Sequence, residues 1–176
     1  MLQRCKAESH LIYNGVELHH KSRKYSYLDT LGVTGDNYIL AVARFVPEKG
    51  LHDLIDAYSA SNASCDLVIA GDSDHEDEYS RTLKQRAHDA GVTLTGYITG
   101  DSLDQVYSHA RLFVLPSYHE GLPIALLEAL SYGLNVLVSD IPANLEVKLE
   151  QSHYFKCGHI HDLRRQLLHQ LGKPPD

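Results

Sequence analysis

The sequence predicts an α/β protein built on a doubly wound parallel sheet, and two observations predict it. Short, wholly apolar runs alternate with segments whose apolar residues recur at helical spacing, and the connections between them are short. Runs without polar alternation are typical of strands that are buried on both faces, as parallel strands are. A chain of 176 residues is long enough to bury a sizeable core in one domain.

Each expected strand comes from an apolar run. The runs are residues 38–43, 66–70, 92–95, 111–115 and 135–138, with a last edge strand at 154–155. Apolar residues at positions i, i+3, i+4 and i+7 predict the helices between them. These helices are expected over residues 51–58, 79–90, 103–110, 123–132 and 163–171. A further short helix is expected over residues 145–150, and Asp101 or Ser102 is expected to cap the helix over 103–110.

The chain divides into three parts. Residues 1–36 are the least regular and are expected to form a lead-in segment, with a short strand at 11–13 and a turn at Asn14-Gly15. Residues 37–172 contain the strand–helix cycles and are expected to be the folded domain. Residues 173–176 include two prolines and are expected to be a tail.

Composition limits the classes of function. The chain is 43% hydrophobic and 22% charged, and it has neither a signal-peptide pattern nor an apolar run near the ~20 residues of a membrane span. Its three cysteines share no close spacing, which favours a reducing compartment, and a cytoplasmic location is expected. The net charge of −7 disfavours nonspecific nucleic-acid binding. A nucleotide ligand stays possible because it needs only a few well-placed cations and amides.

Ligands of doubly wound sheets bind outside the carboxyl ends of the strands, so the loops there hold the candidate site residues. The loop after strand 38–43 carries Arg44 and Lys49, two cations that suit a diphosphate. The alternative is a pair of solvated surface cations. The loop after strand 66–70 carries Asp72-Ser73-Asp74, which suits either a divalent metal or helix capping and loop solvation. The histidines show no metal-site spacing, so no metal site is expected.

The most informative stretch is PSYHEGLPIALLEALSYG, residues 116–133, a strand end, a polar turn and a helix. Gly121 allows close approach to the backbone, and Pro123 suits the first turn of a helix. The amides of Gly121, Leu122 and Ile124 are therefore expected to point at an anion. Glu120 precedes them in the turn.

Two carboxylates in this stretch are candidate ligands for hydroxyl groups. Glu120 would repel a phosphate at contact distance and is better placed to accept hydrogen bonds from hydroxyls. Glu128 lies about two turns into the helix among apolar neighbours, so it is expected to be partly buried and to need a partner. Ribose hydroxyls would serve, and so would a neighbouring basic side chain.

These segments, taken in order, resemble the carboxyl-terminal domain of the retaining, group one (family four) glycosyltransferases. The matching stretches are NG, YILAVARFVPEKG, DLVIAGDSD, GVTLTGYIT, PSYHEGLPIALLEALSYG and SDIPANLE, within about residues 11–171. The most specific part is the E-x7-E spacing of Glu120 and Glu128. The resemblance implies one half of a two-domain GT-B architecture, a Rossmann-like domain that binds a nucleotide sugar. Asn14-Gly15 matches the hinge between the two domains.

The resemblance also implies roles. Glu120 would contact the hydroxyls of the donor sugar, while Arg44 and Lys49 would neutralise the diphosphate leaving group. Main-chain amides would hold the phosphates, Glu128 would bind the ribose, and the loop after strand 92–95 would cradle the base. The nucleotide-binding set implied in this way is Gly121, Leu122, Pro123, Ile124, Glu128, Tyr97 and Ile98. No metal or cofactor is implied.

The implied enzyme moves a hexosyl group from a UDP- or GDP-sugar to an acceptor hydroxyl with retention, in polysaccharide, lipopolysaccharide or glycolipid synthesis. The family's amino-terminal acceptor domain has no counterpart in these residues, so that domain is the expected partner and the chain alone is expected to bind a donor without transferring it. Any membrane contact is expected only through the full enzyme. The alternatives are a nucleotide-sugar epimerase or a phosphorylase-like enzyme on the same architecture, and a non-catalytic module, either one that binds a nucleotide sugar or an interaction module.

Overall fold

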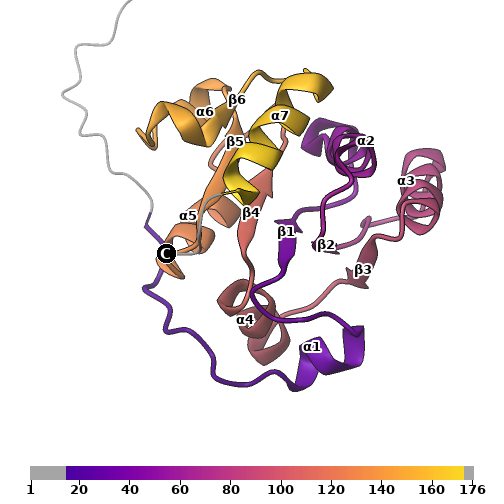
Figure 1. The fold of residues 1–176 in the computed structure, drawn as a ribbon, viewed down its shortest axis with the longest axis vertical. Coiled ribbons are helices and arrows are strands. Elements are labelled where there is room, and N and C mark those ends of the chain that lie inside the picture. Colours follow the sequence, from indigo (N-terminus) through magenta and orange to yellow (C-terminus); the bar gives the residue numbers. More distant parts are fainter. Residues whose placement is uncertain (1–14, 173–176) are drawn as a thin grey trace, which may run out of the picture.

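The computed structural model describes residues 15–172, which form one parallel sheet between two layers of helices (Figure 1). The six strands lie in the order β3-β2-β1-β4-β5-β6, and every pair is parallel. The chain therefore winds outward in one direction from β1 and in the other from β4, which is the predicted doubly wound arrangement.

The strands form where the sequence predicts them, and their ends differ from the predicted ends by at most one residue. Both faces of each central strand are covered, and residues 112–115 are all buried, which explains why their runs are wholly apolar. The strands are β1 (Tyr38–Val42), β2 (Asp66–Ala70), β3 (Thr93–Gly96), β4 (Leu112–Leu115), β5 (Val136–Ser139) and β6 (Tyr154–Phe155).

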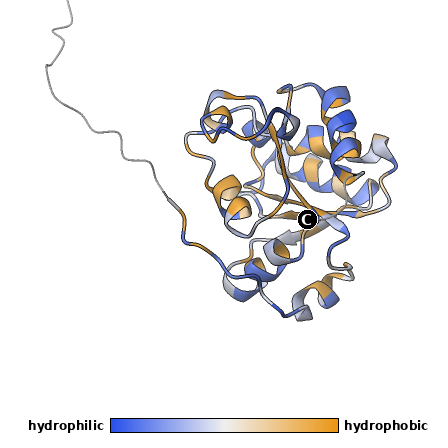
Figure 2. Cartoon of the chain, turned by 60° about the vertical axis from the view of Figure 1, so that its left-hand side comes forward, coloured by the Kyte–Doolittle hydropathy of each residue, from blue (hydrophilic) through white to orange (hydrophobic). Residues whose placement is uncertain are grey.

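Two helical layers cover the sheet. Helices α2, α3 and α7 bury their apolar faces in one core cluster, and α1, α4 and α5 bury theirs in the other. Figure 2 shows the apolar strands inside and the polar helix faces outside. The helices are α1 (Ser26–Leu31), α2 (Leu51–Ser61), α3 (Glu78–Asp89), α4 (Gly100–Ser108), α5 (Ile124–Ser131), α6 (Pro142–Leu145) and α7 (Ile160–Leu171), with 3-10 turns at Pro47–Lys49 and Gln151–His153.

Three local predictions are wrong. Helix α1 lies inside the expected lead-in segment, and its Leu28 is fully buried in the core, so residues from 26 onward are part of the fold. The short helix expected over residues 145–150 lies earlier, at Pro142–Leu145. It starts there because proline favours the first turn of a helix. Helix α4 begins at Gly100 after Thr99, so neither Asp101 nor Ser102 caps it.

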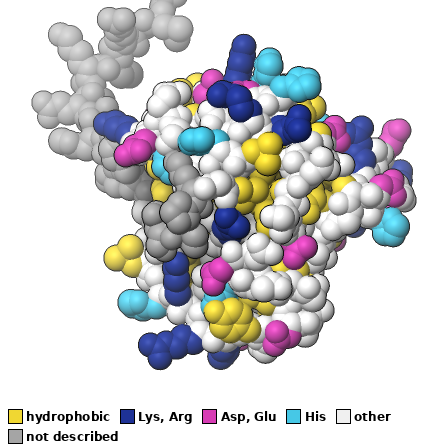
Figure 3. Space-filling view, in the orientation of Figure 1, with side chains coloured by type: hydrophobic (Ala, Val, Ile, Leu, Met, Phe, Trp, Pro, Cys, Tyr) yellow, Lys and Arg dark blue, Asp and Glu magenta, His cyan; other side chains and the backbone are white. Residues whose placement is uncertain are grey.

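Some expectations fall outside the described residues, namely the short strand at 11–13, Asn14 of the turn and the tail at 173–176. Within residues 15–172, none of the helices has the length and apolar character needed to cross a membrane. Acidic and basic side chains are interspersed over the face shown in Figure 3.

Candidate functional site

The candidate site lies at the carboxyl ends of β1 and β4, which are neighbours in the sheet although far apart in the sequence. The chain leaves these strands in opposite directions, so a crevice opens between their loops. The loops contact each other there: the N–H of Tyr118 donates to the carbonyl of Glu48 at 2.8 Å. Gly50 has a φ of +61° and lies against the carbonyl of Pro116, where a Cβ would overlap that oxygen. The close approach of the loops therefore requires a glycine.

Lys49 and Glu120 form an ion pair across this crevice. The Nζ of Lys49 lies 2.7 and 2.8 Å from the two carboxylate oxygens of Glu120, and the Oγ of Ser117 donates to Oε1 at 2.6 Å. The side chains are only 18% and 7% exposed. The sequence assigns these residues to two different parts of a ligand, and the structure shows that they are also bound to each other. Lys49 consequently fixes the orientation of the Glu120 carboxylate.

Arg44 lies apart from this pair and contacts Asp74. The Nη1 of Arg44 is 3.0 Å from Oδ2 of Asp74, and the two side chains are 59% and 68% exposed. An ion pair this exposed is weak, so an incoming anion can replace the aspartate. The two predicted cations therefore differ: Lys49 is enclosed and already paired, and Arg44 is open.

A cavity of about 550 Å³ lies beside Arg44, at the carboxyl ends of β1, β2 and β3. Cavities that hold small ligands are usually of this size. Tyr97 and Ile98, the residues expected to hold a base, line this cavity, although Tyr97 is 82% exposed and stands at the rim. The remaining lining residues are Val42, Ala43, Ala70, Gly71, Asp72, Ser73, Asp74, Thr99 and Leu103.

The two aspartates of the D-x-D segment bind cations of the protein. Asp72 accepts from Lys84 at 2.8 Å, and this bond holds the pKa of Asp72 below its ordinary value against the opposing effect of burial. Asp74 binds Arg44. Within residues 15–172 there is no cluster of three or more His, Cys, Asp or Glu side chains that could hold a metal ion. The arrangement of the two aspartates thus favours ion pairing over the metal-binding alternative.

The turn before α5 presents amides, but not the three that the sequence predicts. The N–H of Ile124 donates to the carbonyl of Leu122 at 2.9 Å around Pro123, so the expectation for Ile124 is wrong in this structure. Pro123 itself stands one residue before the helix rather than in its first turn. The amides of Gly121, Leu122 and Ala125 donate to no acceptor among the described residues. Ala125 was missed, although the first amides of any helix lack intrahelical partners.

Glu128 is half-buried, as predicted, but its partner is not a basic side chain. Its Oε2 accepts a hydrogen bond at 3.0 Å from the hydroxyl of Tyr107, a residue of α4. No cation pairs with Glu128 in the described part of the chain. The sequence places Tyr107 on an apolar helix face, and no spacing rule connects it to a residue on another helix.

Tyr118 anchors the loop that carries Glu120, through contacts that the sequence does not reveal. The hydroxyl of Tyr118 donates to Oδ2 of Asp53 at 2.7 Å and lies 3.0 Å from Nε2 of His52. Burial, followed by the contact with Asp53, raises the pKa of Tyr118, so its hydroxyl stays protonated and remains a donor. Helix α2 therefore holds the turn that carries Glu120, through His52 and Asp53.

Comparison with known proteins shows the family of the chain. The family described as glycosyl transferases group 1 matches residues 29–167. The chain belongs to the group 1 glycosyltransferases. An uncharacterized glycosyltransferase of Methanocaldococcus jannaschii is 31% identical over 146 residues, covering 78% of this chain and 37% of the relative. The serotype-specific mannosyltransferase WbdA of Escherichia coli is 33% identical over 139 residues, covering 74% and 17%.

Solved structures confirm the fold of this group 1 glycosyltransferase chain. The crystal structure of Anabaena HepE in complex with UDP and glucose matches it with a TM-score of 0.79 at 22% identity, over 92% of this chain and 47% of HepE. The chain thus has the Rossmann-like fold of one half of a GT-B glycosyltransferase, as predicted. It spans less than two fifths of the length of the curated relatives described above.

Proposed function

We propose that this domain binds the donor of a glycosyltransferase that moves a hexosyl group from a UDP- or GDP-sugar to an acceptor hydroxyl with retention. One observation carries the proposal: Glu120 is held by Lys49 and Ser117 at the switch point of the sheet, in a chain that belongs to a glycosyltransferase family. Membership of a glycosyltransferase family supports sugar transfer as the reaction, and the crevice is where such a sheet binds ligands.

The described residues suit the parts of such a donor. The cavity beside Tyr97 and Ile98 is the proposed place of the nucleoside. The free amides of the turn before α5 would hold the diphosphate together with Arg44, which would exchange Asp74 for a phosphate oxygen. Lys49 would share its charge between Glu120 and the leaving group. Charge that develops on the diphosphate would then be stabilised by fixed donors without a metal ion.

Glu120 is proposed to accept hydrogen bonds from the hydroxyls of the donor sugar. Its carboxylate is already oriented by two donors, so binding would not require it to reorganise. In a two-domain enzyme that contains this domain, Glu120→Ala is therefore expected to abolish transfer. We further propose that another domain presents the acceptor, that this chain alone does not transfer sugar, and that the full enzyme works in the cytoplasm in polysaccharide or glycolipid synthesis.

Calorimetric titration of the 176-residue chain with UDP and with GDP tests the proposal. We expect one of them to bind, and Arg44→Ala combined with Lys49→Ala to weaken that binding by about tenfold or more, since hydrogen bonds to charged groups contribute roughly 1.5–3 kcal/mol. The matched control is Arg164→Ala with Arg165→Ala, which removes the same charge from exposed positions on α7. Arg44→Ala alone leaves the enclosed pair intact and serves as a second arm.

The outcomes separate the alternatives. Unchanged affinity in the Arg44 and Lys49 variant, with the control also unchanged, refutes the phosphate assignment. Failure of the wild-type chain to bind either nucleotide supports an interaction module that binds no nucleotide sugar. Isomerisation of a donor sugar in the absence of any acceptor, detected by chromatography, supports an epimerase on this fold.

A further inference from the structure

We propose that Tyr107 is a positioning residue that holds the Glu128 carboxylate so that the site distinguishes ribose from sugars lacking its hydroxyls. The inference rests on the proposed function, because it concerns the nucleotide that the crevice would bind. Tyr107 touches no proposed ligand itself. It acts through Glu128, to which its hydroxyl donates at 3.0 Å.

The two oxygens of Glu128 are not equivalent. Oε2 is held by Tyr107, and Oε1 has no partner among the described residues. Oε1 is nevertheless not fully enclosed, since Oδ1 of Asn144 is the one fully buried side-chain polar atom among the described residues that lacks a hydrogen bond. Glu128 therefore presents one fixed oxygen and one available acceptor, which is the arrangement that a hydroxyl-bearing ligand needs.

The phenol of Tyr107 is a dependable donor. Its side chain is about 1% exposed, and burial, followed by the charge of Glu128, raises its pKa well above the ordinary value of 10.0. The hydroxyl thus stays protonated at neutral pH. Its proton can also reach the carbonyl of Ala125, 3.4 Å away, but the charged and closer carboxylate is the stronger acceptor.

The ring that carries this hydroxyl is held by aromatic packing. It stacks on Tyr132 with 5.1 Å between centroids and 3° between planes, and on Phe113 at 6.0 Å. Tyr132 is fixed in turn, because its hydroxyl donates to Oδ1 of Asp104 at 2.6 Å. Elements α4, β4 and α5 therefore all limit the position of Tyr107, and a rigid donor restricts the rotamers of the flexible glutamate.

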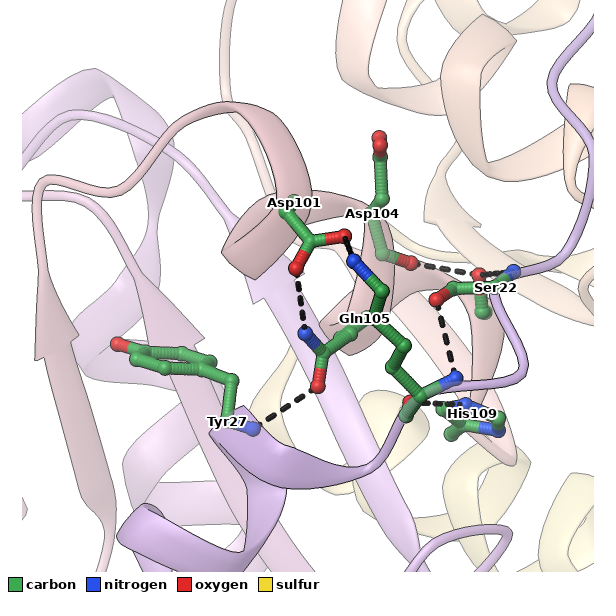
Figure 4. Close-up of polar contacts among 8 residues, drawn as sticks. Ser22, Tyr27, Asp101, Asp104, Gln105 and His109 are labelled. Atoms are coloured by element: carbon green, nitrogen blue, oxygen red, sulfur yellow. Dashed lines mark hydrogen bonds and ion pairs between the residues drawn. The ribbon is translucent and has the colours of Figure 1, made fainter.

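Helix α4 is itself clamped from its outer side by residues 22–27 (Figure 4). The backbone N–H of Ser22 donates to Ser108 at 2.7 Å, and that of Tyr27 donates to the side chain of Gln105 at 2.9 Å. Lys24 contributes twice, through an ion pair with Asp101 and through its carbonyl to His109. These contacts span the whole helix, so α4 cannot shift freely against residues 22–27.

Helix α4 also places this group near the cavity. Leu103 lines the cavity, and Tyr107 lies four residues further along the same helix, about 6 Å by helical rise. Tyr107 is thus about one helical turn from a residue that lines the space proposed for the nucleoside, and Glu128 is bound to Tyr107. The proposal requires that a base bound against Tyr97 and Ile98 leaves the ribose on the side toward Glu128.

The test compares affinities for ribose and for its deoxygenated form. The 176-residue chain is titrated with UDP and GDP and with their 2′,3′-dideoxy forms, and the better-binding base is used throughout. The wild type is expected to bind the ribose form about 10–100 times more tightly. Tyr107→Phe is expected to reduce this ratio at least threefold, while the affinity for the dideoxy form stays the same.

Three further variants test whether the effect of Tyr107→Phe on the ribose preference acts through Glu128, and one of them is a control. Glu128→Gln is expected to reduce the ratio at least as much as Tyr107→Phe, and the double variant no further, because both changes act through one contact. Glu128→Asp keeps the charge but withdraws the carboxylate from Tyr107, and it remains informative if Tyr107→Phe does not fold. Tyr58→Phe is the control: it removes another phenol oxygen, bound to the carbonyl of Cys65, and should leave the ratio unchanged.

The possible failures are distinguishable. If the wild type binds neither nucleotide, the proposed function and this inference fall together. If nucleotide binds but Tyr107→Phe, or Glu128→Asp in its place, keeps the full ribose preference, only the role of Tyr107 is refuted. An equal loss of affinity for ribose and dideoxy forms in Tyr107→Phe also refutes it, because that result indicates a purely structural role.

Discussion

The ion pair between Lys49 and Glu120 should make a large and asymmetric contribution to stability. We consider Lys49→Met and Glu120→Gln, each of which removes one charge and keeps much of the side-chain volume. The Glu120 side chain is 7% exposed and the Lys49 side chain 18% exposed, so the carboxylate has less access to water once its partner is gone. Removing the lysine should therefore cost more than removing the glutamate.

The magnitude follows from this burial. Breaking a buried pair costs about 3–5 kcal/mol, because one charge stays uncompensated. For Lys49→Met we expect roughly 3 kcal/mol, near the lower limit, because Glu120 still accepts from Ser117. For Glu120→Gln we expect about 1–2 kcal/mol, since the ammonium group still reaches water. The double variant should lose less than the sum of the two by at least ~1 kcal/mol.

Urea denaturation followed by circular dichroism measures these free energies, since the chain has no tryptophan for fluorescence. A loss of 3 kcal/mol also corresponds to a fall of roughly 6–12 °C in Tm for a domain of this size. Ser139→Ala is a useful reference, because its buried hydroxyl donates to the Ser117 carbonyl and carries no charge. The reasoning is refuted if both single variants cost under about 0.5 kcal/mol, if Glu120→Gln costs more, or if the effects add.

Two further predictions concern the loops and helix ends. Gly50→Ala should lower the free energy of unfolding by at least ~1 kcal/mol more than Gly133→Ala. Both glycines have positive φ, but only a Cβ at position 50 would overlap the Pro116 carbonyl. Equal losses of the two variants in urea denaturation would contradict this. Hydrogen bonds from Ser80 hold the pKa of Asp77 below its ordinary value of 3.8 at the start of α3. Its stabilisation is therefore complete above about pH 4 and lost as pH falls through the lower folded pKa, so the Tm difference between wild type and Asp77→Ala should narrow from pH 7 to pH 2. A difference that is constant with pH would show that the carboxylate charge is not involved.

The strands and most helices could be predicted because burial on two faces leaves a direct mark on the sequence. Residues 66–70 were predicted with their observed ends, since every residue of β2 after Asp66 is buried. Helix α1 was missed because six residues with one buried side chain, Leu28, produce no periodic pattern. Helix α6 begins at Pro142, a local start signal that the expectation of a helix over residues 145–150 did not use.

The candidate site was predicted as a set of residues but not as a set of contacts. Arg44, Tyr97 and Ile98 do line one cavity, and Lys49 and Glu120 do lie at the same crevice. The pairs that organise them were not visible. Their members come from different elements, whose relative positions no local spacing encodes.

By itself the sequence determined the alternation of strands and helices, the polar residues at the strand ends and the resemblance to a family. Only the tertiary structure decided which of those residues face one another. Strand order places β1 beside β4, and this brings Lys49 to Glu120 across 71 positions of sequence. The packing of α4 against α5 likewise brings Tyr107 to Glu128. The physical reason is that side-chain contacts follow from how buried surfaces stack in three dimensions, whereas periodicity reports only that a surface is buried.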